Sequence, residues 1–149
     1  HMYETRIDTS GTLTQRNMET GTKRQIRSAK LSDNIIKWIG LHGKNEEPGI
    51  HLKVQFPDDF PHLPPFVYVK FPRFEQYSGH ITIGGSICLE MLTISGWNSK
   101  IKPLVLLLMI RDNIIQGNAK IDFKKCVPYD ETVARKTFKR VAEFHGWKV

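Results

Sequence analysis

The sequence has few cysteines, few acidic residues and no long apolar run, and each scarcity excludes something. Two cysteines, Cys88 and Cys126, are too few for a disulfide framework. We expect both to be free thiols, because nothing near the N-terminus has the apolar core of a signal peptide. The longest unbroken apolar run, 104–110, is far shorter than the roughly 20 residues that cross a membrane. We therefore expect a cytoplasmic or nuclear protein with no membrane partner.

Acidic residues are outnumbered, 15 against 22 basic residues, so the 149-residue chain has a net charge of +7. Such a charge permits nucleic-acid binding. The basic residues are scattered, however, and no recognised nucleic-acid motif accompanies them. A nucleic-acid-binding module is therefore the weakest interpretation, and a basic surface suits an acidic protein partner equally well.

The length allows one domain with one substantial core. His1-Met2 resembles an expression scar, and residues 3–24 are polar, rich in Thr and interrupted by glycine. We predict that 1–24 are this scar and a flexible arm, and that 25–149 are the folded domain.

The first half of that domain contains four short runs typical of strands, at 26–31, 35–41, 50–56 and 66–71. Alternation is clearest in the third, where Ile50, Leu52 and Val54 are separated by polar residues. No segment of crossover length separates the runs, so we predict a four-stranded antiparallel meander.

The second half predicts two helices. Pro103 suits the first turn of a helix that continues to residue 115, and this helix is apolar on nearly every face, which indicates central burial. Asp130 and Glu131 suit a second helix start, and Gly146 suits its end. Its predicted apolar face contains Ala134, Phe138, Val141 and His145. Strands followed by helices indicate an α+β domain.

The segment 77–97 is the most informative about function. Cys88 follows the pair Gly84-Gly85, where the missing side chains would let a second chain approach the backbone closely. Upstream, residues 56–65 form a proline-rich corner between two predicted strands, with the sequence Phe-Pro-Asp-Asp-Phe-Pro-His-Leu-Pro-Pro. The run Gly-Gly-Ser-Ile-Cys-Leu-Glu-Met-Leu around Cys88 is similar to the Gly-Ser-Ile-Cys-Leu-Asp-Ile-Leu of ubiquitin-conjugating enzymes. Together with the Gly-Trp near the C-terminus, this set resembles their divergent Q-type branch.

The resemblance implies a domain in which Cys88 carries ubiquitin or a ubiquitin-like modifier as a thioester. The modifier would come from a ubiquitin-activating enzyme and pass to a nucleophile of a protein substrate or to a ubiquitin ligase. Neither a metal nor an organic cofactor is implied. Cys126 has no family-like surroundings, so we expect it to be a bystander.

The chain departs from the common family pattern beside the cysteine. His80 stands eight positions before Cys88, where most members have the Asn of His-Pro-Asn. The resemblance gives this position a role in ordering the site or donating to the oxyanion, which an imidazole N–H can do, and packing is the alternative. Trp97 would be a wall beside the cysteine or a packing anchor. Asn118 lies where the common family places an acid, and with only Asp122 acidic nearby, no base can be assigned.

Three further positions differ on the surface that common members show to RING-type ligases. His62 and Leu63 stand where Phe and Lys are usual, and Lys100 stands where a small residue is usual. These changes argue against binding to standard RING ligases. The family's N-terminal helix is also not evident in residues 3–24. A catalytically inactive adaptor that binds ubiquitin or a ligase is therefore the main alternative to an active enzyme.

Overall fold

The computed structural model describes residues 3–7, 13–17, 23–26, 31–42 and 49–149. The chain divides into two compact units, His1–Gly49 and Ile50–Val149. His1-Met2 and most of the predicted strand 26–31 lie outside the described residues.

The first unit contains an antiparallel sheet of order β1-β2-β3. Its strands are β1 Tyr3–Ile7, β2 Leu13–Asn17 and β3 Lys23–Ile26. Strands therefore occur within the segment predicted to be a flexible arm. In β1, Tyr3, Thr5 and Ile7 alternate with charged residues, and such residue types favour strands. This alternating signal is short and lies among polar residues, so it does not stand out in the sequence.

The first unit also contains the helix α1, Asp33–His42. The strand predicted at 35–41 is therefore wrong. Ile35, Trp38 and Ile39 are buried, and their spacing of i, i+3 and i+4 places them on one face of a helix. Asp33 lies in the first turn, where a negative charge stabilises the helix dipole. The helical spacing of the apolar residues outweighs the strand preference of the isoleucines.

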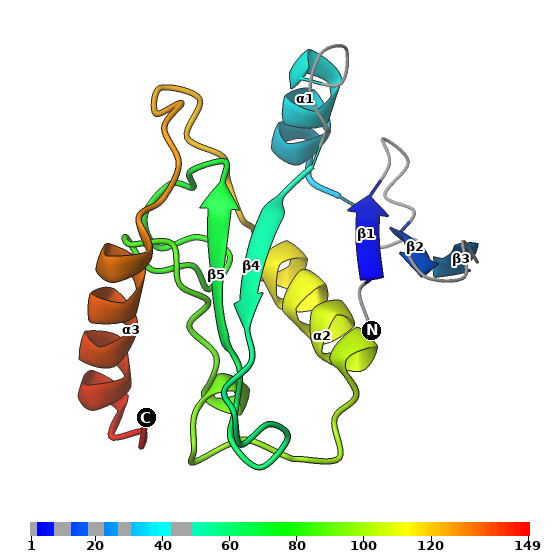
Figure 1. Ribbon diagram of the computed structural model, residues 1–149. Coiled ribbons are helices and arrows are strands. Elements are labelled where there is room, and N and C mark those ends of the chain that lie inside the picture. Colours follow the sequence, from blue (N-terminus) through cyan, green and yellow to red (C-terminus); the bar gives the residue numbers. More distant parts are fainter. Residues whose placement is uncertain (1–2, 8–12, 18–22, 27–30, 43–48) are drawn as a thin grey trace. The chain divides into compact units, whose positions relative to one another are not determined.

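The second unit contains the two strands that the sequence places around the proline-rich corner. These are β4 His51–Gln55 and β5 Phe66–Phe71, which pair antiparallel with Val54 opposite Val67. Figure 1 shows β4 and β5 between the helices α2 and α3. The predicted four-stranded meander is not confirmed, because the sheet formed by β4 and β5 has two strands among the described residues.

Both predicted helices are present. They are α2, Pro103–Gln116, and α3, Glu131–His145. At the start of α3 the Asp130 side chain accepts a hydrogen bond from the backbone of Val133, and at its end Gly146 adopts a left-handed conformation. The α+β class is confirmed. None of the helices in the described part of the chain is long and apolar enough to span a membrane.

Burial of α2 is narrower than predicted. Leu106, Ile110 and Ile114, spaced four residues apart, form its buried stripe. By contrast, Val105 is 44% exposed and Met109 is 38% exposed. A helix that is apolar on nearly every face is buried only where a neighbouring element covers it. Its composition does not reveal which face that is.

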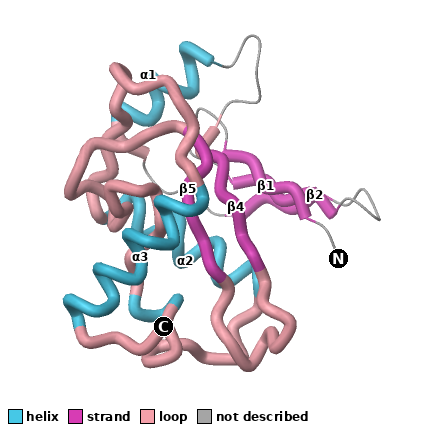
Figure 2. The backbone as a smooth tube through the Cα atoms, turned by 60° about the vertical axis from the view of Figure 1, so that its left-hand side comes forward, coloured by secondary structure: helices cyan, strands magenta, loops and turns pink. Residues whose placement is uncertain are grey.

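The chain between β5 and α2 has little regular structure (Figure 2). It includes the short 3-10 helix η1, Glu90–Leu92, and isolated antiparallel bridges that join Tyr68 to Ser86 and Ile81 to Ile87. Its interior is nevertheless well packed, because Ile87 and Thr93 are fully buried. This irregular but packed segment contains Cys88.

Candidate functional site around Cys88

Cys88 lies at the end of a short hairpin formed by residues 80–88. The Ile81–Ile87 bridge closes the hairpin, and the Cys88 N–H donates to the His80 carbonyl over 2.8 Å. The Ile87 N–H donates to the Val67 carbonyl over 3.0 Å, so the hairpin also continues the sheet beyond β5. The backbone around Cys88 is therefore held on two sides.

The two glycines of the hairpin turn pack against this chain itself. A Cβ at Gly84 would lie 2.7 Å from the Val133 carbonyl of α3. Gly85 has φ of +93°, and a Cβ there would lie 2.5 Å from the ring of Tyr129. The expectation that these glycines make room for a second chain is thus wrong, because their close neighbours are α3 and Tyr129.

A cluster of hydroxyls joins the hairpin to α3. The Thr82 hydroxyl lies 2.7 Å from that of buried Ser86 and 3.0 Å from that of Thr137. Thr137 in turn can donate to the Val133 carbonyl over 3.0 Å. Since buried polar groups are costly when unpaired, this cluster fixes how the hairpin sits on α3.

Cys88 opens into a groove of about 890 Å³ between residues 76–83 and the second half of α3. The Cys88 side chain is half-buried, whereas both of its neighbours are buried. The groove is lined by Gln76, Tyr77, Ser78, Gly79, His80, Ile81, Thr82, Ile83, Cys88, Gly117, Thr137, Arg140, Val141, Phe144 and His145. Its volume is that of a site for a peptide or small molecule.

His80 and Cys88 line this groove together. They are opposite each other in the hairpin, one pair beyond the Ile81–Ile87 bridge. His80 is exposed and has φ of +56°, a conformation that Asn, Asp and Gly tolerate better than most residues. The structure thus brings together these two residues that the sequence singled out.

The loop after α2 packs against Gly79 and the His80 ring. The Gly79 N–H donates to the Gly117 carbonyl over 2.9 Å, and a Cβ at Gly117 would lie 2.9 Å from the His80 ring. Asn118 is exposed, has φ of +50°, and is not among the groove residues. Its neighbour Gly117 is the residue of this loop that reaches the groove.

Burial raises the pKa of the Cys88 thiol above its usual range. The thiol form therefore predominates near neutral pH. Asp122 does not supply a base beside the thiol, because it is not among the groove residues and its carboxylate accepts from the Lys124 N–H. Nucleophilic attack by such a cysteine requires a group that withdraws its proton or a rise in pH.

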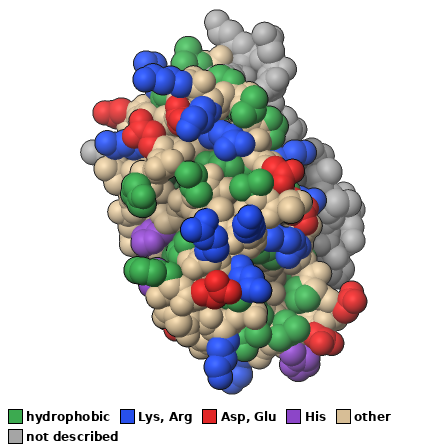
Figure 3. Space-filling view, turned by 90° about the vertical axis from the view of Figure 1, so that its left-hand side faces the viewer, with side chains coloured by type: hydrophobic (Ala, Val, Ile, Leu, Met, Phe, Trp, Pro, Cys, Tyr) green, Lys and Arg blue, Asp and Glu red, His purple; other side chains and the backbone are tan. Residues whose placement is uncertain are grey.

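Arg140 is the one permanently charged residue among the described residues that line the groove. The imidazoles of His80 and His145 also line it, and no Asp or Glu is among these residues. Arg140 belongs to α3, whose exposed side is rich in Lys and Arg, and Figure 3 shows such side chains gathered on this face. Arg140, Thr137 and Phe144 were not identified from the sequence, because α3 follows Cys88 by more than forty residues.

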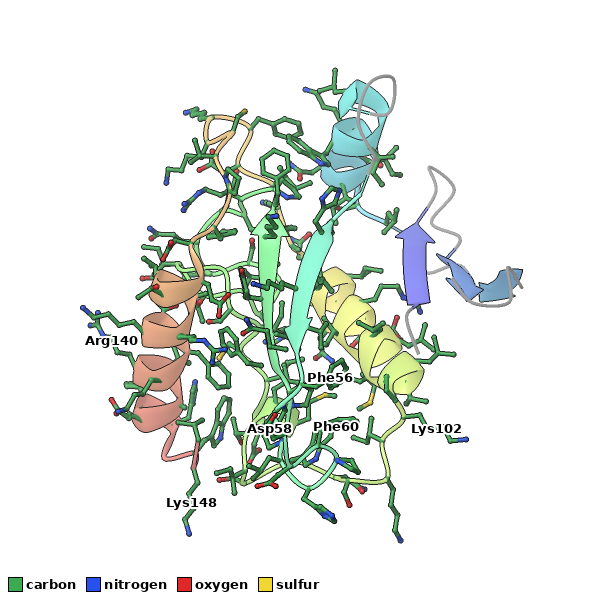
Figure 4. All side chains as sticks on the ribbon, in the orientation of Figure 1. Phe56, Asp58, Phe60, Lys102, Arg140 and Lys148 are labelled. Atoms are coloured by element: carbon green, nitrogen blue, oxygen red, sulfur yellow. The ribbon has the colours of Figure 1, made fainter. Side chains whose placement is uncertain are left out.

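Trp97 lies at the proline-rich corner and is not among the groove residues. Its indole N–H donates to the Pro61 carbonyl over 2.7 Å, and its ring centroid lies 6.1 Å from that of Phe60. Phe60 in turn packs edge-on against Phe56 at 4.7 Å, and Figure 4 shows both at the loop that leaves β4. These contacts describe a packing anchor that ties two loops together.

His62, Leu63 and Lys100 are exposed on these two loops. The Leu63 side chain is 38% exposed and also borders a smaller hollow, of about 260 Å³, with Ile94 and Val149. Exposure of all three residues is compatible with a surface that a partner contacts. Cys126 is exposed elsewhere, with its thiol 3.6 Å from the Phe123 carbonyl.

Within the described residues, no group of three or more His, Cys, Asp or Glu side chains could hold a metal ion. The groove lining combines a thiol with two imidazoles and a guanidinium. Such a set suits acyl transfer through a thioester, with hydrogen-bond donors near the cysteine.

Comparison with known proteins gives this chemistry a context. The family model described as ubiquitin-conjugating enzyme matches residues 6–145. The chain is 30% identical over 129 residues to ubiquitin-conjugating enzyme E2 Q-like protein 1 of Homo sapiens, covering 82% of this chain and 78% of that protein.

Two further relatives carry related names. The chain is 32% identical over 131 residues to ubiquitin-conjugating enzyme E2 25 of Caenorhabditis elegans, covering 74% of this chain and 33% of that protein. It is 33% identical over 102 residues to ubiquitin-conjugating enzyme E2 Q1 of Homo sapiens, covering 66% of this chain and 24% of that protein. The resemblance to the Q-type branch is confirmed.

Proposed function

Because the chain belongs to the ubiquitin-conjugating enzyme family, we propose that it carries ubiquitin as a thioester on Cys88. The observation that carries this proposal is the position of Cys88, half-buried in a groove and held by a hairpin that packs on α3. A thioester carrier needs a cysteine that a partner's C-terminal tail can reach and that does not shift when charged. Cys126 is reachable but lies outside this groove.

Loading would proceed by transthiolation from a ubiquitin-activating enzyme. The Cys88 sulfur attacks the thioester carbonyl of the activating enzyme, a new C–S bond forms, and the sulfur of the activating enzyme leaves with its electron pair. In transfer, the acceptor nucleophile attacks the same carbonyl and the Cys88 sulfur leaves. Both steps pass through an oxyanion, which an N–H donor near Cys88 would stabilise. The acceptor would be a substrate group or the thiol of a ligase.

A catalytically inactive adaptor is the second candidate. The observation in its favour is the absence of His-Pro-Asn, since Ser78, Gly79 and His80 occupy that place. An adaptor of this fold would bind ubiquitin or a ligase without forming a covalent adduct.

A non-reducing gel separates the two functions. The protein is incubated with ubiquitin-activating enzyme, ATP and ubiquitin, and we expect an adduct that disappears on addition of reductant. Cys88→Ala should abolish the adduct, whereas Cys126→Ala, the matched control, should retain it. An adduct lost with Cys126→Ala but kept with Cys88→Ala would overturn the assignment. Binding of ubiquitin without any adduct would favour the adaptor.

A further inference from the structure

We infer that the groove beside Cys88 selects acceptors that carry negative charge next to the reacting amine or hydroxyl. The geometry points to Arg140 as the residue that recognises this charge. The inference rests on the proposed thioester function and names the class of acceptor that the same site takes.

The first support is the distribution of charge along the groove. Its described lining contains one permanent cation, Arg140, and two imidazoles, those of His80 and His145, but no carboxylate. A cationic acceptor surrounded by further basic residues would be repelled here. An acceptor with flanking carboxylates would instead be attracted, because charges within a few ångströms interact appreciably even near a protein surface.

The second support is that Arg140 is free to bind. Two other basic residues of α3 are paired, Arg135 with Glu131 at 3.2 Å and Lys139 with Glu143 at 4.0 Å, whereas Lys136 lies outside the groove. Arg140 has no ion-pair partner within the described ranges. Figure 4 shows Arg140 on the side of α3 that faces away from β4 and β5. A guanidinium offers two parallel N–H donors that match a carboxylate.

The third support is the shape of the lining around Arg140. Phe144, one helical turn further along α3, is 85% exposed and borders the groove, and Tyr77 is exposed on the opposite wall. Exposed aromatic side chains beside a free arginine are typical of surfaces that hold a peptide. Cys88 opens into the same groove, so a peptide held there presents its nucleophile to the thioester.

The reaction itself balances without a further reagent. The acceptor N or O forms a bond to the thioester carbonyl carbon, the C–S bond breaks, and the sulfur of Cys88 leaves with the electron pair. The proton of the acceptor passes to solvent. Arg140 takes no part in these bonds, so it sets which acceptor binds and is not a catalytic residue.

The test measures discharge of protein that has first been loaded with ubiquitin and then separated from ATP. Two sets of three peptides are used as acceptors, one set with a central Lys and the other with a central Ser. Within each set, the central residue is flanked by two Glu, two Gln or two Lys residues. We expect the Glu peptides to react about 3- to 10-fold faster than the Gln peptides, with the Lys-flanked peptides slowest. Higher salt should reduce the difference.

Arg140→Glu should reverse the order, and Arg140→Gln should abolish the preference. Lys136→Glu is the matched control, since Lys136 is an exposed residue of α3 outside the groove and carries the same change of charge. It should retain the preference. Loading of all three variants on Cys88 is measured first, and each discharge rate is normalised to the fraction of protein that is loaded. Equal rates for all peptides would overturn this inference but not the proposed function. So would an effect of Lys136→Glu as large as that of Arg140→Glu. Failure of the wild-type protein to load would overturn the proposed function as well.

Discussion

At the scale of single residues, the reactivity of Cys88 depends on its burial. The thiol lies between buried neighbours, and desolvation disfavours the charged thiolate. Reactive cysteines in other settings have lowered pKa values because a cation or helix N-terminus lies close by. Here the protonated thiol is favoured, so the proposed loading step requires a group that withdraws the proton of Cys88.

We therefore predict slow alkylation of Cys88. In the Cys126→Ser variant, the rate with iodoacetamide at about pH 8 should be several-fold lower than for a free cysteine peptide, because less thiolate is present. Since the pKa is raised, the rate should still be increasing above about pH 9, where a free thiol approaches its plateau. The Cys88→Ser variant, which retains the exposed Cys126, controls for accessibility. A Cys88 rate equal to that of the free peptide at every pH would contradict the prediction.

His80 is the other residue whose candidate roles, as hydrogen-bond donor, base or packing residue, can be distinguished by substitution. If its N–H donates to the oxyanion, His80→Ala should slow discharge of the loaded protein by about 10- to 1000-fold. Loading should suffer less, because it uses a better nucleophile and leaving group. His80→Asn should recover part of the rate, and Asn also tolerates the left-handed backbone at this position.

Single-turnover discharge onto free lysine measures these rates. If His80 instead acts as a base, Asn should restore nothing, because an amide takes no proton at neutral pH. Equal rates for the wild type and His80→Ala, with both folded, would leave only the packing role.

At the scale of elements, the hairpin 80–88 packs tightly against α3. Gly84 packs against Val133 and Thr137 so closely that no side chain fits between them. We predict that Gly84→Ala lowers the free energy of unfolding by about 1–3 kcal/mol, since overpacking forces neighbouring groups to move. It should also slow the loading of Cys88.

Gly146→Ala is the matched control for this prediction. Gly146 has φ of +71° but nothing lies within 4 Å of a Cβ placed there, so the change should cost about 1 kcal/mol and leave loading unaffected. Urea unfolding and the rate of loading measure the two effects. A loading rate for Gly84→Ala equal to that of the wild type would show that the hairpin does not need this contact.

The start of α3 is joined to β4 by charged hydrogen bonds. Glu131 accepts from Lys53 over 2.8 Å and from Gln55 over 2.7 Å, and Arg135 donates to both Glu131 and Gln55. The hydrogen bond from Lys53 is the main cause that lowers the pKa of Glu131 from 4.5 to about 2. A lowered pKa means that the carboxylate stabilises the fold above pH 4.5 and that this contribution is lost as the pH falls towards 2.

Glu131→Gln should therefore flatten the decline of the melting temperature between about pH 4.5 and pH 2. Glu143→Gln is the control, because Glu143 lies on the same helix with a single weak pair at 4.0 Å. It should leave the decline unchanged. Thermal melts of the three proteins across this range test the prediction, and parallel curves for all three would contradict it.

At the scale of the whole molecule, the surface that the family resemblance would assign to ligases is assembled from two separate loops. Trp97 joins them through its hydrogen bond to Pro61, so the scaffold of the surface is in place. His62, Leu63 and Lys100 are exposed on it and differ from the residues that RING ligases usually contact. Loss of a few anchors can remove most of an interface's binding energy.

We predict that common RING domains accelerate discharge of the loaded protein less than roughly two-fold. The double variant His62→Phe with Leu63→Lys should gain acceleration, because the scaffold beneath these residues is already ordered. Discharge onto free lysine with and without RING domain provides the measurement. Strong acceleration of the wild type by several unrelated RING ligases would show that these positions do not decide binding.

Several turns and helix limits of this protein are determined by local sequence. The corner between β4 and β5, the start of α2 at Pro103 and the limits of α3 at Asp130 and Gly146 were predicted, because alternation, proline and capping residues act over a few neighbours. The importance of Cys88 also came from a short run of adjacent residues. The strand predicted at 35–41 was wrong because isoleucines suit both strand and helix, and only burial on one face decides between them.

Tertiary structure alone decided the composition of the groove. Thr137, Arg140 and Phe144 reach the neighbourhood of Cys88 because Gly84 and Gly85 let the hairpin pack onto α3 and Tyr129. It also placed Trp97 at the proline-rich corner. These contacts join residues that are far apart in the chain, so no spacing or local preference records them. The sequence therefore singled out Cys88 as the candidate, while the packing of α3 determined which side chains share its groove.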